Sequence, residues 1–177
     1  MNLPNIMTLT RVLLIPVFVI LIINKNFMAA LITFAIAGIT DGIDGLVARI
    51  TQQRTELGAY LDPIADKLLL ISAFITLAII EIIPSWLAVL VITRDVIILV
   101  GFLVMFLTSY RPKINPSFVS KLTTTFQICT VLLVLLGEYY YILKELFIIA
   151  IYGTAILTIL SGSHYIYVGT RIFNEKK

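Results

Sequence analysis

The chain has 177 residues, of which 60% are hydrophobic and 13% are charged, and its formal net charge is +3. This composition excludes an ordinary soluble domain and predicts a polytopic membrane protein, with residues 1–177 forming a single domain. The small net charge, without a basic stripe, argues against a nucleic-acid-binding protein. A lone cysteine, Cys129, excludes an internal disulfide.

Apolar blocks of about 20 residues, the length that crosses a bilayer, recur along the chain between polar or Pro- and Gly-containing breaks. They predict an all-α fold of six transmembrane helices with a short N-terminal interfacial segment. The expected spans are Thr8–Asn24, Phe27–Arg49, Leu57–Ile80, Ser85–Thr108, Phe118–Gly137 and Lys144–Val168. Because the first block starts almost at the N-terminus and lacks a small-residue cleavage site, we expect no signal peptide.

The opening segment places Pro4 where it suits a first helical turn. Arg11 follows at the expected membrane surface. Its long side chain either anchors the chain to lipid headgroups or reaches a ligand phosphate. The sequence leaves both interpretations open.

The polar stretch from Asp41 to Lys67 carries most of the acidic chemistry of the chain. Four of the five aspartates lie in it: Asp41, Asp44, Asp62 and Asp66. Spacings of three and four residues place the members of each pair on one helix face. Clustered carboxylates repel one another unless a divalent cation lies between them, and oxygen ligands favour Mg²⁺, Mn²⁺ or Ca²⁺ over zinc. The structural alternative is that these aspartates cap helices in a polar loop.

Small and basic residues accompany the carboxylates. Gly45 follows Asp44 directly and Arg49 lies four residues further on, on the same helix face. Glycine permits close approach of the backbone, and arginine binds phosphate through two hydrogen bonds, so a phosphate-bearing ligand is indicated. Two metal ions that bridge a phosphate are one known arrangement for phosphoryl transfer.

Two of the later apolar spans also contain charged residues. Arg94 and Asp95 fall well inside the fourth span, where charges are costly and often functional. We expect Arg94 to bind a phosphate or headgroup; the alternative is a structural Arg94–Asp95 pair. At the start of the fifth span, Lys121, Thr124 and Gln127 follow one side of the helix. Lys121 either binds a ligand there or extends to the membrane interface.

The basic residues predict the orientation. In a six-span topology, ten Lys and Arg residues lie on the side of both termini and of the aspartates, against Lys25 and Lys144 on the other side. The positive-inside rule therefore predicts cytoplasmic termini and a cytoplasmic active site in an integral protein of a bacterial inner or plasma membrane.

The spacing of the polar stretch has a recognisable form. It reads Asp41-x-x-Asp44-Gly45-x-x-Ala48-Arg49, then eight residues, then Gly58-x-x-x-Asp62-x-x-x-Asp66. This pattern resembles the signature of the CDP-alcohol phosphatidyltransferase family at every position. The resemblance implies a membrane enzyme, commonly a homodimer, that uses CDP-diacylglycerol as the donor and releases CMP. It also implies that Asn5, Thr8 and Arg11 lie near the nucleotide.

In such a site, Asp41, Asp44 and Asp62 would hold one Mg²⁺ or Mn²⁺ ion, and Asp41, Asp62 and Asp66 a second. Asp66 would also take the proton of the acceptor hydroxyl as general base. The expected nucleotide-binding residues are Asp44, Gly45, Ala48, Arg49, Thr55 and Gly58.

Arg94 and Lys121 are the expected ligands of the acceptor's phosphate. Two cations suit a phosphorylated alcohol, so the predicted acceptor is glycerol 3-phosphate and the product is phosphatidylglycerophosphate. The alternative within the family is a cardiolipin synthase with phosphatidylglycerol as the acceptor. The alternative from another class is a divalent cation transporter, although the aspartates bunch at one side of the membrane and the outer halves of the spans are apolar.

Overall fold

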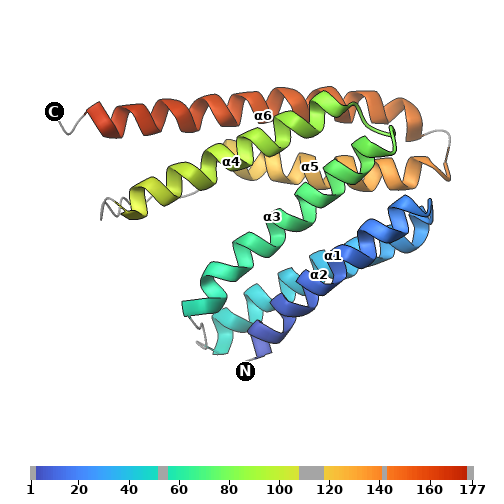
Figure 1. Ribbon diagram of the computed structural model, residues 1–177, viewed down its shortest axis with the longest axis horizontal. Coiled ribbons are helices and arrows are strands. Elements are labelled where there is room, and N and C mark those ends of the chain that lie inside the picture. The colour runs from blue at the N-terminus through green and yellow to red at the C-terminus, as the bar shows by residue number, and fades with distance from the viewer. Residues whose placement is uncertain (1–2, 52–55, 108–117, 141–142, 175–177) are drawn as a thin grey trace.

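The described chain is built from helices and short turns (Figure 1). The computed structural model describes the backbone of residues 3–51, 56–107, 118–140 and 143–174, and side chains within residues 10–40, 67–101, 118–140, 143 and 145–170. The helices are α1 (Leu3–Ile23), α2 (Phe27–Thr51), α3 (Glu56–Ile79), α4 (Ser85–Leu107), α5 (Phe118–Gly137) and α6 (Leu143–Asn174). The all-α fold with six helices is thereby confirmed.

Most helix boundaries agree with the sequence prediction to within two residues, and α5 agrees at both ends. Helix α1 is different, because it begins at Leu3 and not at Thr8. The expected interfacial segment is therefore the first turn of α1. Proline lacks a backbone N–H, and because the N–H groups of a first turn have no partner within the helix, Pro4 costs no hydrogen bond there. Helix α6 continues past Val168 to Asn174, and no proline in that stretch stops it.

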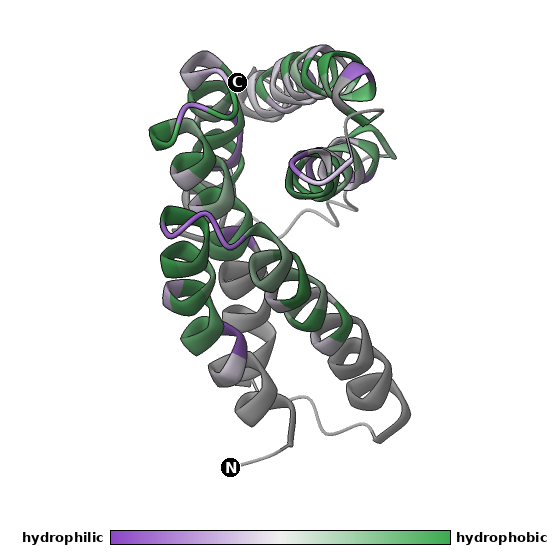
Figure 2. Cartoon of the chain, turned by 90° about the vertical axis from the view of Figure 1, so that its right-hand side faces the viewer, coloured by the Kyte–Doolittle hydropathy of each residue, from purple (hydrophilic) through white to green (hydrophobic). Residues whose placement is uncertain are grey.

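Two helices are long and apolar enough to cross a membrane within the residues that the structure describes. They are Phe118–Gly137 and Glu145–Thr170. Most described residues of the other helices are also hydrophobic, and hydrophilic residues occur at the turns (Figure 2). Each of these helices has exposed hydrophobic side chains, such as Leu13, Ile32, Ile75 and Val89. Six spans remain a prediction.

The helices form two groups of three. Helix α1 packs against α2 and α3, and α6 packs against α4 and α5; α3 and α2 make the contacts between the groups. In Figure 1 the two groups lie close together at the end with the α1–α2, α3–α4 and α5–α6 turns, and they diverge toward the end where both chain termini lie. The predicted six-pass arrangement requires the termini to share one end in this way.

Two of these turns have the same backbone design. Lys25 after α1 and Glu81 after α3 adopt positive φ angles of 56° and 61°. In the first turn, the N–H of Asn26 bonds to the carbonyl of Leu21 at 2.9 Å. This is the Schellman pattern, which satisfies the last carbonyls of a helix. The sharp turns let α2 and α4 run back along α1 and α3.

Aromatic packing joins α1 to α2. The rings of Phe18 and Phe34, both buried, lie 5.5 Å apart at an interplanar angle of 35°. Phe18 belongs to the hydrophobic core that also contains Phe74 and Leu77 of α3. One buried side chain therefore contributes to the packing of the whole first group.

We predict that Phe18→Ala lowers the free energy of unfolding by about 3–5 kcal/mol, because the surrounding helices cannot close the cavity that is left. Thermal unfolding of the purified protein in detergent measures the change. Val17→Ala is the matched control, because Val17 is the preceding residue and is exposed. Equal effects of the two substitutions would contradict the assignment of Phe18 to the core.

Candidate functional site

The aspartate-rich stretch begins on one helix and ends on the next. Asp41 and Asp44 belong to α2, and Asp62 and Asp66 belong to α3. Helix α3 starts at Glu56, so Asp62 lies within the helix, a point that the sequence left open. Helices α2 and α3 contact each other. The signature therefore spans two helices that pack together.

The side chains of residues 41–66 lie outside the described residues. This holds for the predicted metal ligands and general base, and for the predicted nucleotide-binding residues. The full set is Asp41, Asp44, Gly45, Ala48, Arg49, Thr55, Gly58, Asp62 and Asp66. Elsewhere, the described residues contain no group of three or more His, Cys, Asp or Glu side chains that could hold a metal ion. The roles of the signature residues stay predictions.

A buried charged cluster lies next to the signature along the chain. The Asp95 side chain is fully buried, and its Oδ1 accepts hydrogen bonds from Lys67 Nζ at 2.9 Å and from Arg94 Nη1 at 2.6 Å. Lys67 directly follows Asp66 in the sequence. One carboxylate oxygen therefore joins α3 to α4.

Arg94 extends the cluster to two more helices. Its Nε donates to Ser161 Oγ of α6 at 3.1 Å, and its Nη2 donates to the same Oγ at 2.8 Å and to Ser120 Oγ of α5 at 2.6 Å. The guanidinium is buried. Polar side chains from α3, α4, α5 and α6 thus meet around Asp95 and Arg94, and we call Lys67, Arg94, Asp95, Ser120 and Ser161 the charged cluster.

The cluster bears on the two expectations for Arg94. The sequence left open whether Arg94 binds a ligand or pairs with Asp95. In the structure they do pair, because the long arginine side chain folds back to the carboxylate of the next residue. A role in binding the acceptor stays a prediction.

Sequence reasoning missed three partners of this pair: Lys67, Ser120 and Ser161. Their signal was weak, because a basic residue at the end of a signature and single serines in apolar spans have ordinary structural explanations. Only the packing of four helices brings them together.

Lys121 lies on α5 one residue after Ser120, and its side chain is exposed. From Lys121 toward the middle of α5 the side chains become less exposed: Thr124 is half-buried, and Gln127 is completely buried. Neither amide atom of the Gln127 side chain has a hydrogen-bond partner among the residues that the structure describes. The three residues therefore differ in exposure, and Lys121 is the most accessible of them to a ligand.

Arg11 of α1 is only 1% exposed. An arginine that anchors the chain to headgroups would present its guanidinium at the surface. The burial of Arg11 therefore disfavours the anchor and places the residue in the interior of the helix bundle.

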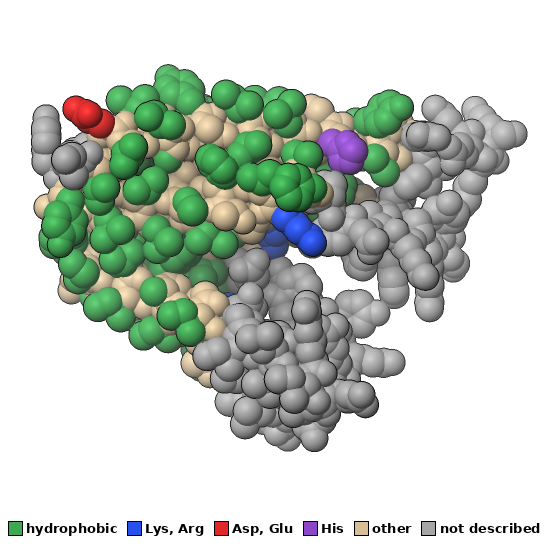
Figure 3. Space-filling view, turned by 180° about the vertical axis from the view of Figure 1, so that it is seen from behind, with side chains coloured by type: hydrophobic (Ala, Val, Ile, Leu, Met, Phe, Trp, Pro, Cys, Tyr) green, Lys and Arg blue, Asp and Glu red, His purple; other side chains and the backbone are tan. Residues whose placement is uncertain are grey.

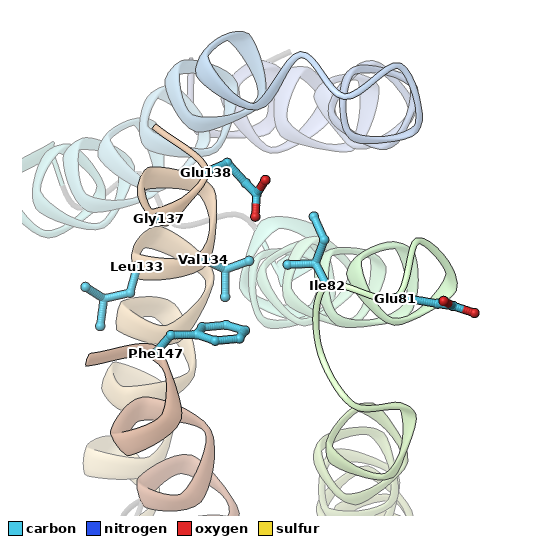
Figure 4. A pocket seen from close by; sticks show the side chains of 7 residues that line it. All are labelled: Glu81, Ile82, Leu133, Val134, Gly137, Glu138 and Phe147. Atoms are coloured by element: carbon cyan, nitrogen blue, oxygen red, sulfur yellow. The ribbon is translucent and has the colours of Figure 1, made fainter. Parts of the chain in front are cut away.

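A few Lys and Arg side chains lie close together on an otherwise mainly apolar face of the described molecule (Figure 3). Two cavities within the described residues lie around the α3–α4 turn and the adjoining ends of α5 and α6, with volumes of about 310 and 430 Å³. Ile82 and Phe147 line both, and Glu138 extends toward the first from the end of α5 (Figure 4). They are mainly apolar and lie at the opposite end from the signature, so neither is a candidate for the chemistry.

Comparison with known proteins gives the same family as the signature. The family model for CDP-alcohol phosphatidyltransferases matches residues 1–160. A CDP-diacylglycerol--glycerol-3-phosphate 3-phosphatidyltransferase of Haemophilus influenzae is 38% identical over 174 residues, which cover 94% of this chain and 92% of that protein. A protein of the same name from Wigglesworthia glossinidia brevipalpis is 34% identical over 179 residues, covering 97% and 96%.

A second group of relatives carries a different name. The human cardiolipin synthase (CMP-forming) is 36% identical over 146 residues, covering 73% of this chain and 48% of that protein. This chain thus spans about half the length of the cardiolipin synthases that it matches. Both groups are membrane enzymes, in agreement with the two long apolar helices.

We predict that Ser161→Ala lowers the free energy of unfolding by about 1–3 kcal/mol, because the buried guanidinium of Arg94 loses the hydroxyl that accepts two of its hydrogen bonds. Thermal unfolding in detergent provides the measurement. Ser163→Ala is the control, because Ser163 lies two residues away on α6 and is exposed. A loss at position 163 as large as at position 161 would contradict the importance of these bonds.

Proposed function

Because this chain belongs to the CDP-alcohol phosphatidyltransferase family, we propose that it transfers the phosphatidyl group of CDP-diacylglycerol to glycerol 3-phosphate. The acceptor oxygen forms a bond to the phosphorus of the phosphatidyl group, the bond from that phosphorus to CMP breaks, and phosphatidylglycerophosphate is formed. The observation that carries the choice of acceptor is the match, over nearly the full length of both chains, to two proteins named for this reaction. Family membership also favours an enzyme over a cation transporter.

The proposed setting is a membrane crossed by all six helices, with residues 1–177 as one domain that forms a homodimer. Support for the topology comes from the antiparallel succession of α1 to α6, which brings both termini to one end (Figure 1). In the six-span topology, ten of the basic residues are assigned to the side of the termini, and Lys25 and Lys144 to the other side. By the positive-inside rule, the termini and the active site face the cytoplasm.

The proposed metal site consists of Asp41 and Asp44 of α2 and Asp62 and Asp66 of α3. A set of carboxylate oxygens on two contacting helices fits Mg²⁺ or Mn²⁺, which prefer oxygen ligands. When bound, two such ions supply positive charge that stabilises the diphosphate as charge moves to the leaving phosphate. Asp66 accepts the proton of the attacking hydroxyl.

The nucleotide is proposed to bind along the same stretch. Arg49 contacts its phosphates, and the glycines at 45 and 58 permit close approach of the backbone. Ala48, Asp44 and Thr55 complete the set.

The acceptor phosphate is proposed to bind Arg94 and Lys121, which lie on α4 and α5. Lys121 is exposed, so its ammonium group is accessible to the phosphate. The four described hydrogen bonds of Arg94 leave one of its five N–H donors for a ligand. Acceptor and donor are thereby held by different halves of the helix bundle.

A cardiolipin synthase is the second candidate, and the observation that favours it is the similarity to the human enzyme over 73% of this chain. The charges do not separate the two acceptors: Lys67, Arg94 and Asp95 together carry a net charge of +1, which adds to the charge of Lys121.

We expect the purified protein to release CMP from CDP-diacylglycerol when glycerol 3-phosphate is added, and not with phosphatidylglycerol alone. Chromatography of the lipid products separates phosphatidylglycerophosphate from cardiolipin. Product with phosphatidylglycerol alone would replace the first candidate by the second. Release with neither acceptor would remove both.

We predict that Asp62→Asn lowers kcat by about 10²–10³-fold or more, because the transition state loses charge stabilisation at its phosphates. The variant should also need more Mg²⁺ or Mn²⁺ for half-maximal activity, which a metal titration of CMP release measures. Glu145→Gln is the control, because Glu145 is an exposed carboxylate in the first turn of α6. Near wild-type activity of Asp62→Asn at low metal concentration would exclude Asp62 from the metal site.

A further inference from the structure

We propose that Asp95 is a positioning residue: by holding Lys67 and Arg94 on one carboxylate, it fixes α3, and the carboxylates that α3 carries, relative to α4, α5 and α6. This role rests on the proposed function because it assigns catalysis to α3, but it does not depend on which acceptor is used. Asp95 itself contacts no substrate in this role.

The position of the Lys67–Asp95 bridge is suited to this task. Helices α3 and α4 are joined by the short turn after Ile79 and diverge from it (Figure 1). At 1.5 Å per residue, Lys67 lies about 18 Å along α3 from its end, and Asp95 lies about 15 Å along α4 from its start. A link so far from the turn restrains the angle between the helices much more than a link beside the turn would.

Few other polar contacts between the two groups of helices are described by the structure. Two side-chain hydrogen bonds join α1–α3 to α4–α6 within the described residues. One runs from the Met28 backbone N–H to the Tyr139 hydroxyl at 3.1 Å, at the start of α2 and thus near the turns. The other is Lys67–Asp95, which is the described link closer to the signature, since Lys67 immediately follows Asp66.

Asp95 is the fixed partner of this bridge and Lys67 the adjustable one. The Asp95 side chain is 0% exposed, and Arg94 ties it to Ser161 of α6 and Ser120 of α5. Lys67 has a side chain that is 22% exposed and four carbons long, and it reaches across from α3. Charge-assisted hydrogen bonds in a buried setting are strong and directional, so the ammonium holds α3 at a defined distance from α4.

The consequence for catalysis follows from the neighbouring residue. Asp66 is one position from Lys67, so a shift of the α3 backbone at Lys67 moves the proposed general base as well. Misplacement of a catalytic group by about 1 Å can cost about 10²-fold in rate. A bridge that sets this position should therefore affect turnover more than substrate binding.

The test uses Lys67, because removal of Asp95 would leave a buried, uncompensated Arg94 and could prevent folding. Lys67→Met removes the bridge but keeps the Arg94–Asp95 pair. Lys67→Arg is the matched variant, because it keeps a cation that reaches Asp95. Thermal unfolding in detergent establishes that both variants are folded.

The first measurement is the distance between the two groups of helices. Cys129 is the one cysteine of the sequence, so Cys129→Ser provides a background without thiols. Spin labels are then placed at Ile39 of α2 and Val100 of α4, which are 63% and 52% exposed. Double electron–electron resonance on the full-length protein should give a broader and longer distance distribution for Lys67→Met than for Lys67→Arg, which should match the parent.

The second measurement is the kinetics of CMP release in the same set of proteins. Lys67→Met should lower kcat by about 10–100-fold with little change in the KM of either substrate, and Lys67→Arg should restore most of kcat. An unchanged distance distribution in Lys67→Met would overturn the positioning role, as would a broader distribution with full kcat. A parent protein inactive with both acceptors would instead refute the proposed function, while the distances would still decide whether the bridge fixes the two groups.

Discussion

A single buried carboxylate has to satisfy two cations in the middle of an otherwise apolar helix bundle. Arg94 and Asp95 are both buried, so burial has removed their hydration. The hydrogen bond between them, and those from Arg94 to the hydroxyls of Ser120 and Ser161, compensate for this loss. Such a group tolerates few arrangements of its partners. The packing of α4 against α5 and α6, and the approach of α3, must all agree with that geometry.

At several positions between α5 and α6, buried hydroxyls donate hydrogen bonds to helix carbonyls or to other hydroxyls. Thr130 and Thr154 share a hydrogen bond of 2.7 Å between α5 and α6, and Thr123 reaches the carbonyl of Leu157 across the same interface. Hydroxyl side chains of this kind allow close helix approach where a membrane provides no hydrophobic driving force between helices. Helices α5 and α6 thus form a firm support for Ser120 and Ser161.

The two groups of helices divide the proposed chemistry between them. The carboxylates and, apart from Thr55, the proposed nucleotide-binding residues belong to α2 and α3, whereas Arg94 and Lys121 belong to α4 and α5. Transfer between donor and acceptor would then take place where the groups diverge, and the relative position of the groups would enter the reaction geometry directly. The charged cluster is the described element that connects the two groups close to this region, and in the proposed mechanism it would help to set their relative position.

The sequence by itself determined the six helices and the family. Apolar runs of bilayer length set the helices, and the signature depends only on residue types at fixed spacing along two of them. Local pattern did not reveal that α1 includes the first residues or that α6 extends to Asn174, since neither end carries a strong stop signal. Local pattern also did not reveal the partners of the Arg94–Asp95 pair. Ser120 and Ser161 lie 26 and 67 residues from Arg94, and Lys67 lies 28 residues from Asp95, so only tertiary packing brings them together. Which cation remains available to a ligand was likewise decided by burial, because a charge in an apolar span is reactive or structural according to what surrounds it.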